Sequence, residues 1–379
     1  MSESQERDCD EEVLRALATV VEPVLAYDLV ALGLVERTKK SFGRGEVTVR
    51  LPIKPYPFRE ELIASTSAAL STTSDFRRAK VTLVDADDAS QRRLEAVLLG
   101  LLPAGATEAI TERRPSFAVA SSPTRILGIS SGKGGVGKSS VTVNLALALA
   151  RLGKRVGILD ADIYGFSIPK MLGVEETPAL VGSFMVPPRS FGVSCMSIGF
   201  FLDEDSPVVW RGPMLHKALE QFVVDVFWGP LDFLVVDMPP GTGDVVLSLG
   251  EFLPRCEIYV VTTPQRAAHA VAQRSAFAAK KLKLPLRGVI ENMSYFVGHD
   301  GERYEIFGSG GGEELASVLS LPLLAQVPLE VSVRDGGDRG EPVVVSDPEG
   351  AAAQVFVELA QKIAAFGAPR RYRQELKIS

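Results

Sequence analysis

The sequence predicts an α/β fold in which a mainly parallel sheet is flanked by helices, with a small α+β domain ahead of it. Three observations predict the larger fold. Short apolar runs without alternation recur over residues 125–327, which is typical of strands buried on both faces of a parallel sheet. Stretches of helical periodicity lie between or after these runs, as in repeated strand–helix units. A glycine-rich loop joins the first run to the first helix.

The first part of the chain, residues 1–102, predicts the small α+β domain. Its helical stretches are Glu11–Val24, Phe58–Leu70 and Ser90–Leu99. Its extended stretches are Asp28–Val35, Glu46–Ile53 and Lys80–Val84, with a turn at Phe42–Gly45.

A linker is predicted over residues 103–123, where prolines and glycine interrupt a stretch without steady periodicity. The larger domain then takes residues 124–379. Its predicted strands are Arg125–Ser130, Arg155–Leu159, Val193–Ile198, Phe233–Val236, Ile258–Thr262, Arg287–Ile290 and Leu323–Val327. Its predicted helices include Lys138–Leu152, Met214–Phe227, Gln265–Lys281 and Pro348–Phe366.

Composition excludes several classes of protein. A net charge of -6 argues against a general nucleic-acid partner, which needs a basic field. No apolar run reaches the roughly 18 residues that span a bilayer, and the polar N-terminus has no signal-peptide pattern. We therefore expect a cytoplasmic protein without a membrane partner. Cys9, Cys195 and Cys256 lie far apart, so no disulfide framework or zinc-like spacing is present, and the last two are expected to be buried thiols.

The strongest motif is a phosphate-binding loop between the first strand and the first helix of the larger domain. The pattern Gly132-x4-Gly137-Lys138-Ser139 fits a P-loop, the phosphate cradle of nucleoside triphosphatases. Glycines let backbone N–H groups turn toward phosphate oxygens, Lys138 reaches the β- and γ-phosphates, and the Ser139 hydroxyl ligates Mg²⁺. The predicted nucleotide-binding residues of the loop are Gly132, Gly134, Gly135, Val136, Gly137, Lys138, Ser139 and Ser140.

Carboxylates follow two of the predicted strands, at the sheet edge where open α/β folds bind ligands. Asp237 is predicted to hold Mg²⁺ through water, with Asp160 supporting the metal shell and Asp162 orienting the attacking water. A helix N-cap is the alternative role for Asp160 or Asp162. The segment Pro239–Gly243, rigid at one end and mobile at the other, suits a switch loop that senses the γ-phosphate.

The loop carries a second lysine, Lys133, that a generic P-loop does not need. KGGVGKS resembles the deviant P-loop of the MinD/ParA/nitrogenase-iron-protein ATPases. The resemblance implies an ATP-bound homodimer in which Lys133 reaches the partner's nucleotide and acts like an arginine finger. The catalytic residues are then Lys133, Lys138 and Asp162; a solvated loop lysine is the alternative for Lys133. The same resemblance also implies that Asn292 reads the adenine edge and favours ATP over GTP. The alternative for Asn292, taken by itself, is a turn residue.

Further motifs resemble one family, the Mrp/ApbC iron–sulfur cluster carrier ATPases. They cover essentially all of residues 125–345 and are Asp160–Gly165, Trp210–Met214, Leu231–Asp244, Thr262–Gln265, Glu291–Phe296 and Phe307–Gly312. The stretch VEPVLAYDLVALGLV is similar to the small iron–sulfur-assembly domain often fused ahead of such an ATPase. The resemblance implies a dimeric ATPase that transfers iron–sulfur clusters to apoproteins, with assembly proteins or apoprotein clients as partners.

The chain departs from this family at the cluster ligands. The family has a CxxC closely after ENMSYF, whereas here the place reads VGHDG over residues 297–301, so no iron–sulfur ligand is identified. His299 and Asp300 suit either a harder metal or a surface turn. Pro55–Pro57 occupies the region of the small domain where the family commonly has another cysteine.

The expected function is a slow ATP hydrolase that requires Mg²⁺ and works as an iron–sulfur cluster carrier or assembly dimer. A cluster-free, ATP-driven dimer switch acting on protein partners is one alternative. A ParA/MinD-like positioning ATPase is another, although the basic tail at residues 368–374 is short and has no apolar stripe.

Overall fold

The computed structural model describes residues 10–41, 44–74, 76–102, 105–112, 115–118, 122–163, 165–202, 212–241, 244–265, 282–298 and 300–367. The chain forms two compact units. The first comprises residues 1–102, 178–186 and 225–229, and the second comprises residues 103–177, 187–224 and 230–379. The N-terminal unit therefore includes two segments from the middle of the chain, which no sequence pattern indicated.

The first unit contains a three-stranded sheet in the order β1-β2-β3, with β1 and β2 antiparallel and β2 and β3 parallel. Its strands are β1 (Val35–Ser41), β2 (Arg44–Arg50) and β3 (Lys80–Val84), and its helices are α1 (Glu11–Leu17), α2 (Arg59–Leu70) and α3 (Asp88–Leu101). The predicted strand Asp28–Val35 is wrong. Leu29 and Leu32 are buried in a turn whose N–H groups are capped by the Asp28 carboxylate, and the strand is the polar segment after it, at the sheet edge.

Two inserted segments complete this unit. The hairpin of β6 (Ala179–Val181) and β7 (Phe184–Val186) contacts α3, because the Gly182 N–H donates to Gln91 Oε1 at 2.9 Å. Segment 225–229 supplies Phe227, whose ring lies 5.9 Å from Phe184 and 6.3 Å from Tyr27. Such contacts between distant segments leave no periodic pattern in either segment.

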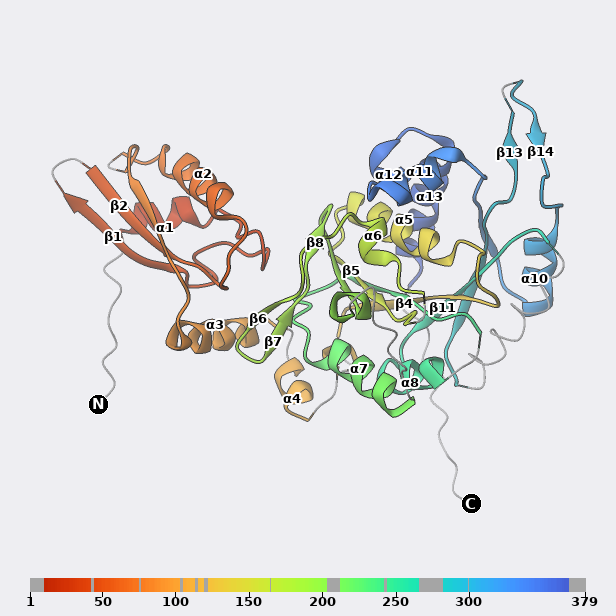
Figure 1. Cartoon of the computed structure of the whole chain (residues 1–379), viewed down its shortest axis with the longest axis horizontal. Coiled ribbons are helices and arrows are strands. Elements are labelled where there is room, and N and C mark those ends of the chain that lie inside the picture. The colour runs from red at the N-terminus through yellow and green to blue at the C-terminus, as the bar shows by residue number, and fades with distance from the viewer. Residues whose placement is uncertain are drawn as a thin grey trace, which may run out of the picture. The chain divides into compact units, whose positions relative to one another are not determined.

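The second unit is built on an eight-stranded sheet in the order β15-β12-β11-β4-β10-β5-β9-β8. Figure 1 labels β4, β5, β8 and β11 of this sheet. All neighbours are parallel except β8 and β9. Its strands are β4 (Arg125–Ser131), β5 (Val156–Asp160), β8 (Arg189–Ser190), β9 (Val193–Ser197), β10 (Phe233–Asp237), β11 (Glu257–Thr262), β12 (Leu286–Glu291) and β15 (Leu323–Gln326). The predicted α/β fold with a mainly parallel sheet is confirmed.

The remaining elements of this unit surround the sheet or extend from it. They are α4 (Ala106–Thr111), η1 (Ser116–Ala118), α5 (Lys138–Arg151), α6 (Ile168–Met171), η2 (Ile198–Phe201), α7 (Gly212–Val224), α8 (Asp244–Phe252), β13 (Phe296–Val297), β14 (Arg303–Tyr304), α10 (Gly311–Leu319), α11 (Val331–Arg339), α12 (Val343–Ser346) and α13 (Ala351–Ala365). The predicted helix at residues 265–281 lies outside the described residues beyond Gln265, as does the basic tail. Among the described residues, no helix is long and apolar enough to cross a bilayer.

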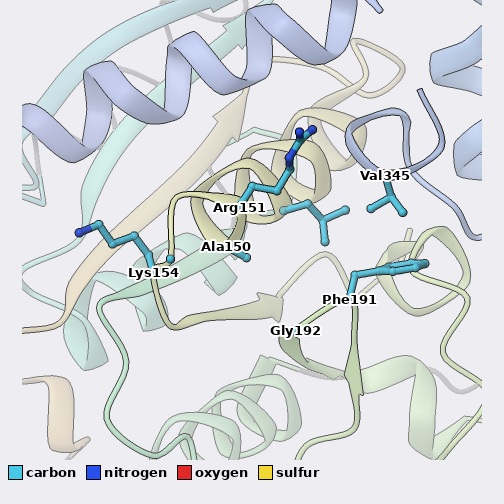
Figure 2. A pocket seen from close by; sticks show the side chains of 8 residues that line it. Ala150, Arg151, Lys154, Phe191, Gly192 and Val345 are labelled. Atoms are coloured by element: carbon cyan, nitrogen blue, oxygen red, sulfur yellow. The ribbon is translucent and has the colours of Figure 1, made fainter. Parts of the chain in front are cut away.

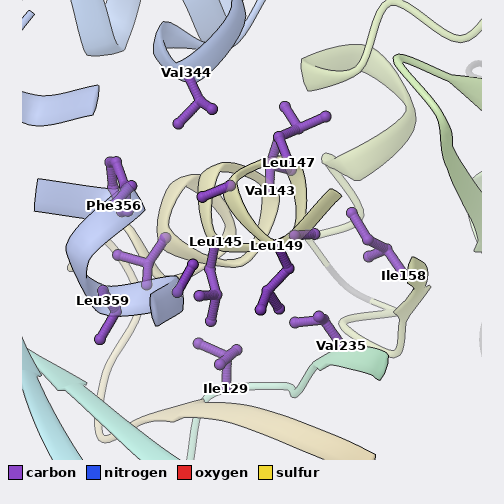
Figure 3. Packing of buried hydrophobic residues seen from close by; sticks show 14 of the residues in the cluster. Ile129, Val143, Leu145, Leu147, Leu149, Ile158, Val235, Val344, Phe356 and Leu359 are labelled. Carbon is purple, nitrogen blue, oxygen red and sulfur yellow. The ribbon is translucent and has the colours of Figure 1, made fainter. Parts of the chain in front are cut away.

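Helix α5 is enclosed by other elements (Figure 3). Leu145 and Leu149 point to Ile129 of β4 and Val235 of β10, while α13 and α12 cover other sides of the helix. Because α5 is buried around its circumference, its sequence is apolar nearly throughout. The N-terminus of this helix, where the P-loop ends, is thereby held rigidly against the sheet.

The order of the strands places a crevice at the carboxyl end of β4. From β4 the chain moves to β5 and β9 on one side, returns to β10, and continues with β11, β12 and β15 on the other side. Such a reversal separates the loops above neighbouring strands and creates the ligand-binding crevice of open α/β sheets. The P-loop follows β4 directly.

Candidate functional site

The P-loop backbone has the conformation that its glycines allow. Gly135 and Gly137 have φ angles of +78° and +76°, in the left-handed region, and Gly137 is the N-cap of α5. A Cβ atom at position 137 would overlap Asn292 Nδ2. Glycine is therefore required here both by the backbone conformation and by the close approach of a second loop.

A buried cluster of charge lies at the start of α5. Lys138 Nζ is 2.7 Å from Asp237 Oδ2 and 3.3 Å from Asp162 Oδ2, and all three side chains are buried. Asp160 adds a third buried carboxylate on the neighbouring strand β5. One ammonium group faces three carboxylates, so this end of α5 carries an excess of buried negative charge.

Asp237 is oriented by hydroxyl groups from two successive turns of α5. Ser139 Oγ donates to Asp237 Oδ2 at 2.6 Å, and Thr142 Oγ1 donates to Asp237 Oδ1 at 2.7 Å. The predicted magnesium residues Ser139 and Asp237 are thus in direct contact. Thr142 was missed by the sequence reasoning, although its position one turn after Lys138 on the same helix was a signal for it.

Asp160 lies at the end of β5 and contacts the loop that carries Asp162. It is opposite Asp237 in the strand register, and its carboxylate accepts from Ser197 Oγ at 3.0 Å and from the Asp162 N–H at 3.2 Å. Burial, and then the nearby charge of Asp237, raise the pKa of Asp160 to about 7 against the opposing effect of Lys138. Asp160 therefore shapes the loop that carries Asp162.

The alternative role as a helix N-cap does not hold for Asp160 or Asp162. The N-cap of α6 is Ser167, although the Ile168 N–H also approaches Asp160 Oδ2 at 3.4 Å. Asp162 instead pairs with Lys138, and burial raises its pKa while the lysine opposes that shift. Its carboxylate lies close enough to the P-loop lysine to act beside a bound phosphate.

Lys133 points to a different partner. Its side chain is half-buried, and Nζ donates to Gln265 Oε1 at 3.3 Å. The first lysine of the loop is thus held by the segment after β11, whereas the second is held by Asp237 and Asp162.

Asn292 meets the P-loop although it lies far along the sequence. Its Nδ2 donates to the Val136 carbonyl at 2.9 Å, and the side chain is buried. A hollow of about 450 Å³ opens beside it, and Gly137 and Ser140 of the loop region also line this hollow. Apolar walls come from Met171, Leu329 and Val333, which the sequence reasoning missed. Lys170, Glu330, Arg334 and Asp338 also line the hollow. A hollow with apolar walls and a buried amide beside a phosphate loop suits a nucleotide base.

Another hollow, of about 390 Å³, lies at the opposite end of α5 (Figure 2). Arg151, Lys154 and Phe191 border it, together with Val345 of α12. Since α5 separates it from the P-loop, this hollow is not part of the site.

The cysteines of the second unit are buried, as predicted. Cys195 lies within β9 and Cys256 precedes β11, and burial raises the pKa of both thiols. The hairpin of β13 and β14, which projects from this unit, occupies the place of the family's CxxC (Figure 1). His299 lies outside the described residues, and Asp300 accepts from the Tyr304 hydroxyl at 2.5 Å and the Glu302 N–H at 3.0 Å. In the described part of the chain, no group of three His, Cys, Asp or Glu side chains is arranged to hold a metal ion.

A P-loop at the switch point of a parallel sheet, with a serine on the helix paired to an aspartate on the next strand, defines a P-loop nucleoside triphosphatase. Residues 122–364 match the model of the ParA family described as "NUBPL iron-transfer P-loop NTPase", and the chain belongs to this family.

Known relatives agree with this assignment. An iron–sulfur cluster carrier protein of Mycobacterium leprae is 40% identical over 362 residues, which cover 93% of this chain and 92% of that protein. The carrier protein of Bacillus subtilis is 42% identical over 303 residues, covering 75% and 86%. A nucleotide-binding protein from Archaeoglobus fulgidus, solved in complex with ADP, is similar at 33% identity with a TM-score of 0.55 and covers 66% of this chain and 96% of its own. The resemblance to the iron–sulfur carrier ATPases is therefore confirmed.

Proposed function

We propose that this protein binds and slowly hydrolyses ATP with Mg²⁺ as a homodimer, and that the cycle serves the assembly or transfer of iron–sulfur clusters. The observation that carries the proposal is the meeting of Lys138, Ser139 and Asp237 beneath a P-loop with left-handed glycines. The relatives are named iron–sulfur cluster carrier proteins, which supports the proposal that an iron–sulfur cluster is what the cycle serves.

Different residues of the site would bind the phosphates and the cation. Lys138, now paired with Asp237 and Asp162, would exchange these carboxylates for phosphate oxygens when a triphosphate enters. Ser139 and Asp237, which are in contact, would then be the protein groups that hold the cation. Bound Mg²⁺ supplies neutralisation of charge on the β- and γ-phosphates.

The remaining roles concern hydrolysis. Asp162 lies beside Lys138 and is the residue we assign to orient the attacking water. We assign Lys133 to the nucleotide of the partner copy in the dimer, because its contact with Gln265 directs it away from the carboxylates that hold Lys138. Asn292 is assigned to the base.

Gly137→Ala is expected to weaken ATP binding on the order of a hundredfold, because the new Cβ displaces both the P-loop and Asn292. Gly153→Ala is the matched control: it has a similar φ angle of +74°, lies just beyond the far end of α5 and has open space around the added Cβ. Titration calorimetry of both variants with ATP and Mg²⁺ measures the effect. Wild-type affinity in Gly137→Ala would contradict the assignment of this loop.

A second candidate function is a cluster-free switch that acts on protein partners in the ATP state. The specific observation in its favour is that residues 297–301 contain no thiol, while Cys195 and Cys256 are buried. Thiolates are the usual ligands of iron–sulfur clusters, and a transferable cluster needs ligands that its acceptor can reach. In this alternative, the protein would drive assembly without itself holding the cluster.

Anaerobic reconstitution with iron and sulfide separates the two candidates. We expect well under one cluster per dimer by visible absorbance and by iron and sulfide analysis, since the described thiols are buried with raised pKa values. A relative that carries the CxxC, loaded in parallel, is the control. A full cluster per dimer in this protein would establish direct carriage and contradict the cluster-free switch.

A further inference from the structure

We propose that Glu291 is a positioning residue that holds residues 292–294, here called the base-reading loop, and that it thereby sets the preference for adenine over guanine nucleotides. This inference rests on the proposed binding of ATP and on the role of Asn292. The Glu291 carboxylate accepts hydrogen bonds from three protein donors, and we assign the selectivity of the site to the position in which these bonds hold the loop.

Glu291 is the last residue of β12, and its exposed fraction is 1%. Its Oε1 accepts from Ser294 Oγ at 2.5 Å and from Gln326 Nε2 at 3.0 Å, while its Oε2 accepts from the Gly312 N–H at 2.5 Å. These donors come from the loop after β12, from β15 and from the first turn of α10. A buried carboxylate with three donors is stable only while all of these segments stay in place.

The loop that Glu291 holds has a strained backbone. Met293 has a φ angle of +54°, in the left-handed region, which is unfavourable for a residue with a long side chain. The bond between Ser294 and Glu291 spans this residue, and Ser294 N also donates to the Val327 carbonyl at 2.8 Å. Without the carboxylate, the turn would relax toward a more favourable backbone conformation.

The position of α10 depends on the same carboxylate. A Cβ atom at Gly312 would lie 2.7 Å from Glu291 Oε2, and one at Gly311 would overlap the Pro264 carbonyl. The run of glycines in this part of the sequence therefore lets the helix N-terminus lie directly on Glu291. The negative charge is favourable there, because the N-terminus of a helix carries a partial positive charge.

The loop conformation determines which atom of Asn292 faces a bound base. Asn292 Nδ2 donates to the Val136 carbonyl, which leaves the Oδ1 acceptor to meet a base bound in the adjoining hollow. Adenine presents an amino donor at its sixth position, whereas guanine presents a carbonyl oxygen there. An amide held in this orientation accepts from adenine and repels guanine, and a loop released from Glu291 loses that distinction.

The test compares Glu291→Gln with Glu257→Gln in the full chain. Glu257 lies on the neighbouring strand β11, at the opposite end of the sheet, and its exposed fraction is also 1%. In Glu291→Gln an amide nitrogen faces donors, so the KM for ATP should rise about tenfold and the ATP-over-GTP ratio of kcat/KM should fall about tenfold. The kcat for ATP should change by less than about threefold, because the catalytic residues are untouched.

Two milder variants protect the test against a failure to fold. Ser294→Ala removes one bond to the carboxylate, and Glu291→Asp keeps the charge with a shorter reach; both should lower the ATP-over-GTP ratio less than Glu291→Gln does. Glu257→Gln should lower the melting temperature yet keep the ratio, which separates positioning from general stability.

Each outcome decides one question. If wild type binds neither nucleotide, the proposed function is wrong and the inference fails with it. If wild type prefers ATP and both Glu291→Gln and Ser294→Ala keep that preference, the function stands and the role of Glu291 is overturned. A wild type that accepts ATP and GTP equally also overturns it, as does a loss of stability in Glu291→Gln without any change in the ratio.

Discussion

Lys133→Ala is expected to lower ATP turnover about a thousandfold, because a cation supplied to the transferred phosphoryl group in trans has effects of at least that size. ATP affinity should change by less than about threefold, since Lys133 contacts Gln265 whereas Lys138 is the lysine held among the buried carboxylates. Steady-state phosphate release and titration calorimetry measure the two quantities. Lys154→Ala, at an exposed lysine beyond α5, is the control and should leave both unchanged.

Mixing variants tests whether the lysine acts across the dimer. At ATP concentrations that saturate Lys133→Ala, Gly137→Ala should be largely unoccupied and inactive because its ATP affinity is about a hundredfold lower, yet it retains Lys133. In an equal mixture with Lys133→Ala, half of the randomly exchanged dimers contain one complete site, which predicts about a quarter of wild-type activity. Unchanged turnover in Lys133→Ala alone would contradict a catalytic role. Loss of turnover without recovery in the mixture would place the lysine in its own copy.

Glu257→Gln is expected to lower the free energy of unfolding by about 3 kcal/mol, because it removes a buried counter-charge from two half-buried guanidinium groups. Glu257 accepts from Arg125 Nε and Nη2, both at 2.8 Å, and lies 3.0 Å from Arg287 Nε. Arg125 also donates to the carbonyls of Ile363 and Phe366 at the end of α13. The ion pair of Arg125 and Glu257 therefore connects β4, in the middle of the sheet, to the end of α13.

Urea denaturation measures this effect. Asp232→Asn is the control, since it breaks the exposed pair of Arg155 and Asp232 and should cost less than about 1 kcal/mol. A loss below about 1 kcal/mol in Glu257→Gln would show that the buried pair contributes no more than the exposed one. Nucleotide affinity should be unchanged in both variants, because both positions lie at the amino ends of the strands.

The larger fold was predictable because its strands are buried on both faces. Residues such as those of β10 leave a continuous apolar run, and the strand is found one residue longer than predicted. The small domain was less predictable. Its strand β1 is polar and lies at a sheet edge, whereas the apolar Leu29 and Leu32 form a turn, so the strand was placed too early. Burial is a property of the folded sheet, and an edge strand need not display it.

Some residues of the site were also predictable from local sequence, whereas others were not. The predicted P-loop residues, from Gly132 to Ser140, lie within nine consecutive positions and follow from the local requirements of a phosphate-binding backbone. Thr142 and Glu291 were not predicted as site residues, because their importance comes from partners on other elements: Asp237 for the first, and Ser294, Gln326 and Gly312 for the second.

The sequence by itself determined a phosphate-binding loop, a parallel α/β sheet and the absence of the family's cysteine pair at residues 297–301, since each is a local pattern of residue types. Only the tertiary structure decided that Ser139 contacts Asp237, 98 residues away, and that Asn292 contacts Val136, 156 residues away. The physical reason is the strand order, which brings the carboxyl ends of β4, β10 and β5 together. The tertiary structure also places Glu291 between the base-reading loop and α10. This position depends on the packing of the loop after β12, of α10 and of β15.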